Sequence, residues 1–301
     1  MPSVSIVITT YNRAGLLPRA IESAKNAASD VEVIVVDDCS RDETPEVCAR
    51  IEGIRSVRLR HNQGLANARN VGIAECASEF IAFLDDDDLR LPGSLDKQLP
   101  VLKASDGAAF CYGQALIGDA RRQLPTGELY PLSCPQGDIF WELLADNFIP
   151  MPSVVARKSC LIAQNCFNTE LTLIEDWDMW LRLSEHFAVA AVAEPVAIHR
   201  KAVATSNQMC SNSLEICRQA LRVQQLALDR PRAKAASRTQ CRSSRRKFQH
   251  RAYDILITEA TRFIHDGDNR SARANLRDAF RLRPFRTLAS GRLPWLLMMH
   301  R

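Results

Sequence analysis

The sequence predicts an α/β fold with a mostly parallel sheet flanked by helices, followed by a helical C-terminal extension. Two observations predict the sheet: strand-like runs alternate with segments of helical spacing, and polar clusters follow the runs. Val31–Val36, for example, is almost continuously β-branched, which is typical of a strand buried on both faces. Strands that alternate with helices of this length form βαβ units and a mostly parallel sheet.

Periodicity places the individual elements. Apolar or β-branched runs predict strands, and apolar residues spaced three and four apart predict helices. The expected strands are Val4–Ile8, Val31–Val36, Val57–Leu59, Phe80–Leu84, Ser153–Ala156 and Phe187–Ala193. The expected helices are Leu16–Ala24, Thr44–Ile51, Leu65–Ala77 and Asp176–His186. Ligands of such sheets bind beyond the carboxyl ends of the strands, which is where the polar clusters fall.

Cysteine usage and hydropathy indicate the compartment. The ten cysteines are scattered with no Cys-x-x-Cys pair, which argues against a zinc site. The start of the chain lacks a basic segment followed by an apolar one, so no secretory signal is expected. No apolar stretch approaches the roughly 18 residues that span a bilayer. We therefore expect reduced thiols and a cytoplasmic location.

Four consecutive aspartates, Asp85–Asp88, follow the strand Phe80–Leu84. Carboxylates this close repel one another unless a cation neutralises them. Such oxygen ligands favour Mg²⁺ or Mn²⁺, which complete their shell with water and phosphate oxygens. A solvated acidic turn or a helix cap is the alternative. The sequence has no EF-hand, Walker A loop or dinucleotide glycine fingerprint, so a metal would be the main holder of phosphates.

Two further acidic clusters allow two interpretations each. Asp37-Asp38 follows the second strand and can bind a base or ribose, or form a capped turn. Glu175–Asp178 begins a predicted helix, where a carboxylate can interact with the helix dipole. A carboxylate there can also act as a general base that activates an alcohol. The residues by themselves leave both alternatives open in each cluster.

Together these clusters resemble the motifs of the inverting glycosyltransferases of family 2, which have the GT-A fold. The five matching segments are Ser3–Arg13, Val35–Thr44, Asn62–Asn70, Phe80–Asp88 and Glu175–Asp178. One departure is Cys39-Ser40, where the family usually has Gly-Ser. The resemblance implies a GT-A domain at residues 1–205, with a nucleotide-sugar-binding half at 1–106 and an acceptor half at 107–205.

The resemblance also implies roles for single residues. Asp38 would bind the base, Asp85 would face the ribose or donor sugar, and Asp87 would hold Mn²⁺ or Mg²⁺, with Asp86 as a substitute. Asp176 would be the general base. The residues implied on the donor side are Thr9, Tyr11, Asp38, Asn62, Gly64, Asp85 and Asp86.

A second departure lies after the acceptor half. Family members often have Tyr-Arg-x-His there, with a histidine that helps at the diphosphate, and this chain has His199-Arg200-Lys201-Ala202. His199 either substitutes for that histidine or is structural, and Arg200 or Lys201 is an alternative phosphate contact.

The resemblance implies an enzyme that moves a sugar, with inversion, from a UDP-sugar to a hydroxyl of a glycan or lipid-linked acceptor in cell-surface polysaccharide synthesis. Two rivals remain. A sugar-phosphate nucleotidylyltransferase would need a glycine-rich loop after the first strand, and Thr9–Arg13 has none. An inactive sugar-nucleotide-binding protein is disfavoured by the presence of both Asp87 and Asp176.

Residues 206–301 form a separate part. Residues 218–301 contain 20 Lys/Arg and 6 Asp/Glu, a balance of +14, whereas residues 1–217 contain the remaining 19 and 29, a balance of −10. Helices are expected at Ser213–Leu228, Ala252–Ile264 and Ala272–Leu282, with a basic low-complexity linker at Pro231–Lys247. Peripheral contact with the inner membrane leaflet and a partner-binding role are both consistent with this charge. Nucleic-acid binding is disfavoured because aromatic residues are few.

Overall fold

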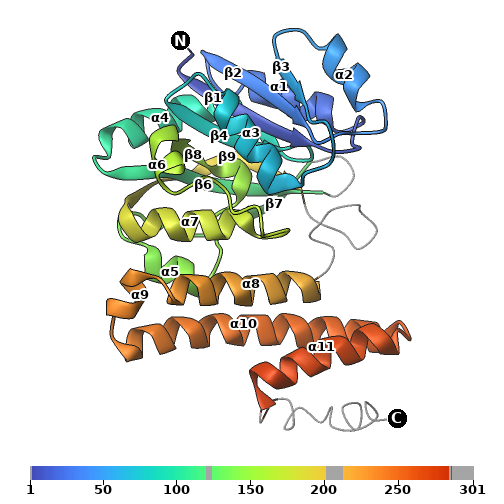
Figure 1. Cartoon of the computed structure of the whole chain (residues 1–301), viewed down its shortest axis with the longest axis vertical. Coiled ribbons are helices and arrows are strands. Elements are labelled where there is room, and N and C mark those ends of the chain that lie inside the picture. Colours follow the sequence, from blue (N-terminus) through green and yellow to red (C-terminus); the bar gives the residue numbers. More distant parts are fainter. Residues whose placement is uncertain (1, 120–123, 201–212, 285, 287–301) are drawn as a thin grey trace. The chain divides into compact units, whose positions relative to one another are not determined.

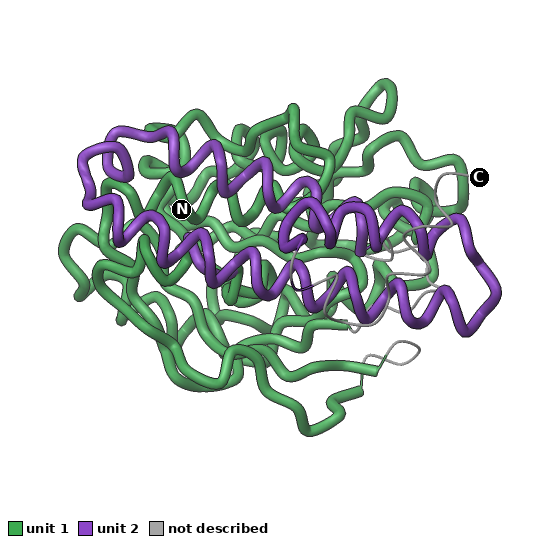
Figure 2. The backbone as a smooth tube through the Cα atoms, turned by 90° about the horizontal axis from the view of Figure 1, so that it is seen from below, with its two compact units in different colours: residues 1–143, 147–203 green, residues 144–146, 204–301 purple. Residues whose placement is uncertain are grey.

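The computed structural model describes residues 2–119, 124–200, 213–284 and 286. The chain divides into two compact units, coloured separately in Figure 2. Unit 1 comprises residues 1–143 and 147–203, and unit 2 comprises residues 144–146 and 204–301. The domain boundary predicted between residues 205 and 206 lies outside the described residues.

Unit 1 is built on a nine-stranded sheet with the order β3-β2-β1-β4-β8-β6-β9-β5, and β7 pairs with β6 (Figure 1). The strands are β1 Val4–Thr10, β2 Val31–Asp37, β3 Arg55–Arg58, β4 Phe80–Asp85, β5 Leu89–Arg90, β6 Ala108–Gly118, β7 Pro125–Tyr130, β8 Val155–Arg157 and β9 Ala188–Arg200. β3, β2, β1 and β4 run parallel, whereas β8 is antiparallel to both β4 and β6. The predicted α/β fold is confirmed.

Helices cover both faces of the parallel strands. The helical elements of unit 1 are α1 Leu17–Lys25, α2 Thr44–Arg50, α3 Leu65–Glu75, α4 Ser94–Ala104, α5 Phe140–Ala145 (its last two residues fall in unit 2), the short 3₁₀ helix Met151–Ser153, α6 Lys158–Ala163 and α7 Glu175–His186. Apolar residues of α1 and α4 join one core cluster with alternate residues of β1, β2 and β4. On the other face α3 approaches β1 so closely that a Cβ at Gly72 would lie 2.2 Å from Val7 Cγ1. A glycine is therefore required at this contact.

The strand register brings the polar clusters together. Thr9 of β1 is the pairing partner of Val36 on one side and of Asp85 on the other, and Thr10 is the partner of Asp37. The carboxyl ends of β1, β2 and β4 thus meet at one edge. This edge is where ligands of parallel sheets bind.

Unit 2 is helical, with α8 Ser213–Leu228, α9 Pro231–Ala235, α10 Arg238–His265 and α11 Asn269–Leu282. The predicted linker at Pro231–Lys247 is wrong, because α9 and the first turns of α10 occupy it. Ser237 caps α10 by accepting a hydrogen bond from the Gln240 amide, and Arg, Lys and Gln favour helices. Ser244 and Phe248, four residues apart, are buried. Within the described part of the chain, no helix has both the length and the apolar composition needed to cross a bilayer.

Candidate active site

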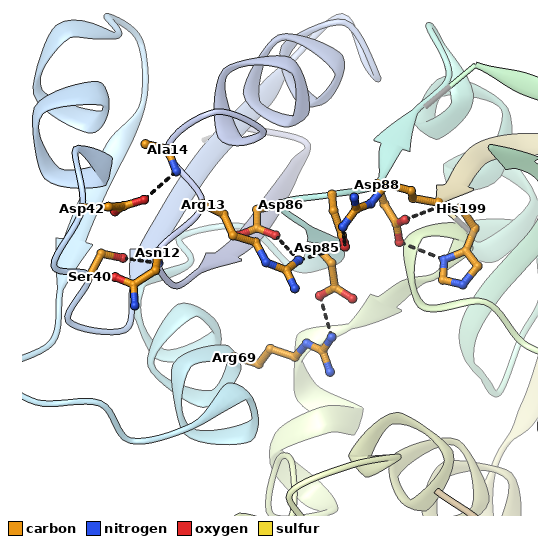
Figure 3. A network of polar contacts seen from close by, with 12 residues as sticks. Asn12, Arg13, Ala14, Ser40, Asp42, Arg69, Asp85, Asp86, Asp88 and His199 are labelled. Carbon is orange, nitrogen blue, oxygen red and sulfur yellow. Dashed lines mark hydrogen bonds and ion pairs between the residues drawn. The ribbon is translucent and has the colours of Figure 1, made fainter. Parts of the chain in front are cut away.

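The loop after β1 is fastened to the loop after β2. The Asn12 amide donates a hydrogen bond to Ser40 Oγ at 2.8 Å, and Asn12 adopts a left-handed φ of 54° (Figure 3). Thr9, at the end of β1, is buried, and its hydroxyl has no hydrogen-bond partner among the described residues. Tyr11 is 42% exposed. The two predicted donor residues of this loop therefore lie at the same strand end, one buried and one open to solvent.

Asp38 joins the second and third predicted motifs. Its carboxylate accepts hydrogen bonds from the amides of Gln63 at 2.7 Å and Gly64 at 2.8 Å, directly before α3. Asn62 Nδ2 donates to the Asp38 carbonyl at 3.3 Å. Burial raises the pKa of Asp38, and the two amide hydrogen bonds oppose that rise. Asp38, Asn62 and Gly64 thus lie together, and Asp38 also fixes the turn that leads into α3.

Asp86 and Asp87 are buried and paired with arginines. Arg13 Nη1 contacts Asp86 Oδ1 at 2.9 Å and Asp87 Oδ2 at 2.8 Å. Arg200 Nη2 contacts the same Asp87 oxygen at 2.7 Å. Burial raises the pKa of Asp86 to about 7, against the opposing charge of Arg13. The negative charge of this pair is therefore met by guanidinium groups from the β1 loop and from the end of β9.

Asp88 is fixed by the end of β9. Its Oδ2 lies 3.0 Å from His199 Nδ1, and its Oδ1 accepts a hydrogen bond from the Arg200 amide at 2.8 Å (Figure 3). The Asp88 carboxylate raises the pKa of His199 to about 9. Of the residues proposed for the missing family histidine, His199 and Arg200 both contact the aspartate cluster, and Lys201 lies outside the described residues.

Arg69 connects the two halves of unit 1. This arginine of α3 is 3% exposed, and its Nη2 lies 2.7 Å from Asp85 Oδ1. Its Nη1 forms an ion pair with buried Glu175 at the start of α7. Burial alone would lower the pKa of Arg69, but the charges of Asp85 and Glu175 more than offset it, so the pKa is raised. Burial raises the pKa of Glu175 to about 7, with Arg69 opposing the rise.

Asp176 lies in the first turn of α7, next to this ion-pair network. Burial raises its pKa, Arg69 opposes the rise, and the charge of Asp85 adds to it. Ile174, directly before α7, has a φ of 57°, an uncommon conformation for a β-branched residue. The preceding loop is held by Asn70 of α3, which exchanges two hydrogen bonds with the Phe167 backbone at 2.8 and 2.9 Å. The structure thus brings the donor-side Asp85 and the predicted base Asp176 to one polar site.

Three arginines and one glutamate are site residues to which the sequence motifs gave no firm role: Arg13, Arg69, Arg200 and Glu175. Their signal was present in the sequence, since Arg13 and Arg69 lie inside predicted motifs. Among the described residues, no group of three His, Cys, Asp or Glu side chains is arranged to hold a metal ion. In the structure Arg13 and Arg200 pair with Asp86 and Asp87.

The arrangement is that of a glycosyltransferase: carboxylates at the end of β4 face a carboxylate-bearing helix across an arginine. The family model for glycosyl transferase family 2 matches residues 5–160, more than half of the chain. The protein therefore belongs to glycosyl transferase family 2.

Relatives are similar over parts of the chain. An uncharacterised glycosyltransferase of Haemophilus influenzae is 29% identical over 64% of this chain and 66% of its own length. A Campylobacter jejuni relative, named GalNAc(5)-diNAcBac-PP-undecaprenol β-1,3-glucosyltransferase, is 36% identical over 39% of each chain. The matched regions thus span less than two thirds of these relatives. The crystal structure of S. aureus TarS 1–349 in complex with UDP is 17% identical, with a TM-score of 0.64 over 95% of this chain and 82% of that one. This likeness confirms the fold.

Replacing Cys39 by glycine is expected to stabilise the protein. Cys39 has a φ of 65°, which explains why the family usually has glycine here. A non-glycine residue in this region is strained by roughly 1–2 kcal/mol, part of which the larger unfolded-state entropy of glycine cancels. We expect Cys39→Gly to raise the free energy of unfolding by about 1 kcal/mol, measured by urea denaturation. Cys39→Ala is the control for loss of the thiol and should give no gain, and an equal gain in both variants would contradict the explanation.

Proposed function

We propose that this chain is an inverting, metal-assisted transferase that moves a sugar from a UDP-sugar to a hydroxyl of a glycan or lipid-linked acceptor in surface polysaccharide synthesis. The observation that carries the proposal is the Asp85–Arg69–Glu175 network, which places Asp176 beside the carboxyl end of β4. The names of two relatives support the acceptor class, one acting on an undecaprenol-linked glycan and one in succinoglycan biosynthesis. TarS, a relative in fold, was crystallised with UDP and with UDP-GlcNAc.

The aspartates fit a hard divalent cation. Asp85 is the most exposed of the four, with 27% of its side chain accessible, and Arg69 contacts one of its two oxygens. Asp85 and Asp87 would hold Mn²⁺ or Mg²⁺, with Asp86 as a substitute, and phosphate and water oxygens would complete the shell. When bound, such an ion stabilises, as a Lewis acid, the negative charge that develops on the departing diphosphate.

The protein's own cations have a second part in the reaction. Arg13 and Arg200 converge on Asp87 within 2.8 Å, so both guanidinium groups stand at the position where a diphosphate beside this aspartate would lie. Arginine binds phosphate oxygens through paired N–H donors. We therefore assign Arg13 and Arg200 to the diphosphate of the donor, in the place of the missing family histidine.

Asp176 is proposed to take the proton of the acceptor hydroxyl as that oxygen attacks the sugar carbon from the face opposite the diphosphate. Asp176 is partly buried, and a carboxylate with a raised pKa is a better proton acceptor than an ordinary aspartate. Glu175 pairs with Arg69 and so fixes the start of α7, while Asp176 remains available as the general base. One displacement of this kind inverts the anomeric centre.

Replacing Asp176 by asparagine is expected to remove transfer while leaving donor binding intact. General-base catalysis typically contributes about 10²- to 10⁴-fold, so UDP release from UDP-glucose or UDP-GlcNAc with Mn²⁺ should fall by that factor. Binding of UDP, measured by calorimetry, should stay unchanged. Glu170→Gln, which removes an exposed carboxylate from the preceding loop, is the control and should keep full activity. Full activity of Asp176→Asn would exclude this residue as the base.

The rate should also depend on pH in one direction. Asp176 acts as a base only when ionised, and burial raises its pKa above the usual aspartate range. We therefore expect kcat/KM to fall as the pH is lowered, beginning at a higher pH than it would with a base of ordinary aspartate pKa. A rate profile measured from acid to neutral pH checks this. A flat profile down to the pKa of an ordinary aspartate would contradict the assignment.

A further inference from the structure

The first half of α10 carries a concentration of positive charge that the proposed reaction does not use. From residue 230 to residue 251 the sequence has no Asp or Glu. Its basic residues are Arg230, Arg232, Lys234, Arg238, Arg242, Arg245, Arg246, Lys247 and Arg251. Arg251 pairs with Asp146 of the same unit. Arg242, Arg246 and Lys247 are exposed, and within the described residues of the chain no carboxylate pairs with them.

These charges share one face. Arg242 and Arg246 are four residues apart, and Lys247 and His250 continue the same side of the helix. Thr239, Arg242, Ser243, Arg246, Lys247 and His250 line one open groove.

Two further arginines reach this face from the end of α11. Arg283 Nη2 lies 3.5 Å from the Arg246 carbonyl, and the Arg286 guanidinium lies 5.2 Å from the centre of the Tyr253 ring. We call Arg242, Arg246, Lys247, Arg283 and Arg286 the basic face.

The basic face is not electrostatically balanced. Burial together with the charges of Arg283, Arg286 and Arg246 lowers the pKa of His250, and burial together with Arg246 and Arg286 lowers that of Arg283. Asp254 lies 3.6 Å from Arg286, and within the described residues no carboxylate pairs with Arg242, Arg246 or Lys247. A surface with such an excess of one sign attracts anions of the other.

We propose that the basic face binds the surface of a bilayer that contains anionic phospholipids. From Arg242 to Tyr253, whose ring Arg286 covers, the charges extend along about three turns of α10, roughly 17 Å at 1.5 Å per residue, which suits a plane of head groups better than a single small anion. Clusters of Lys and Arg on a helix are attracted to anionic leaflets. The sequence that follows Arg286 contains Leu293–Met299, an apolar run with Trp295 in it, and such residues favour the membrane interface.

Single-stranded nucleic acid is the competing anionic partner, and the face lacks what it would need. Proteins that bind it without sequence preference stack bases on exposed aromatic rings. Phe248 and Tyr253, the aromatic residues of α10 beside the basic face, are both buried, and Arg286 covers the Tyr253 ring. The lipid surface therefore fits the described residues better.

Sedimentation of the full chain with vesicles tests the proposal. We expect the protein to pellet with vesicles of equal parts phosphatidylcholine and phosphatidylglycerol at about 0.1 M salt, and not with phosphatidylcholine alone. Binding should disappear at about 1 M salt, where the Debye length falls from about 10 Å to about 3 Å. The double variant Arg242→Gln, Arg246→Gln should bind roughly thirtyfold more weakly, since each basic residue near an anionic surface contributes about fivefold.

The matched control is Arg50→Gln, Lys103→Gln, which removes the same charge from exposed positions of unit 1 and should bind as the wild type does. Circular dichroism checks that both variants fold, and the salt dependence of the wild type tests the proposal without any variant. Equal pelleting with neutral vesicles, or equal weakening in both variants, would overturn it. So would wild-type protein that binds single-stranded RNA or DNA but no vesicle.

Discussion

Four adjacent carboxylates at the end of β4 must be neutralised, and the cations that do so come from three distant parts of the chain. Arg13 follows β1, Arg69 lies on α3, and His199 and Arg200 end β9. Because most of these groups are buried, removing one partner would leave an uncompensated charge, which typically costs about 3–5 kcal/mol. The same contacts that neutralise the aspartates also hold β1, α3 and β9 at the edge of the sheet.

Helix α3 couples the two halves of unit 1. Its Arg69 contacts Asp85 on one side and Glu175 on the other, and the neighbouring Asn70 holds the backbone of Phe167. Two contacts position the helix itself. Asp38 binds the amides before its first turn, and Gly72 allows it to lie against Val7. A ligand that displaced Asp38 or Arg69 would therefore change the position of the loop before α7.

The strands and the carboxylates could be predicted from the sequence, but the ion pairs that Arg13 and Arg69 form with those carboxylates could not. Val31–Val36 and Phe80–Leu84 are continuous apolar runs, so their strands, and the aspartates that follow them, were evident without tertiary information. In the sequence Arg69 is an ordinary helical arginine. Its ion pair with Asp85 becomes evident only from the fold, in which the strand register pairs Asp85 with Thr9. The start of α10 was missed because its basic composition suggested a linker, whereas its burial pattern depends on contacts between distant residues.

We propose that the aspartates at the end of β4 hold a metal ion beside the diphosphate of a nucleotide. Anomalous diffraction from crystals grown with Mn²⁺ and UDP measures this directly, because it locates the ion independently of activity. We expect a manganese peak within coordination distance of Asp87 or Asp85, with Arg13 or Arg200 on the diphosphate. A peak bound elsewhere, with UDP away from these carboxylates, would contradict it.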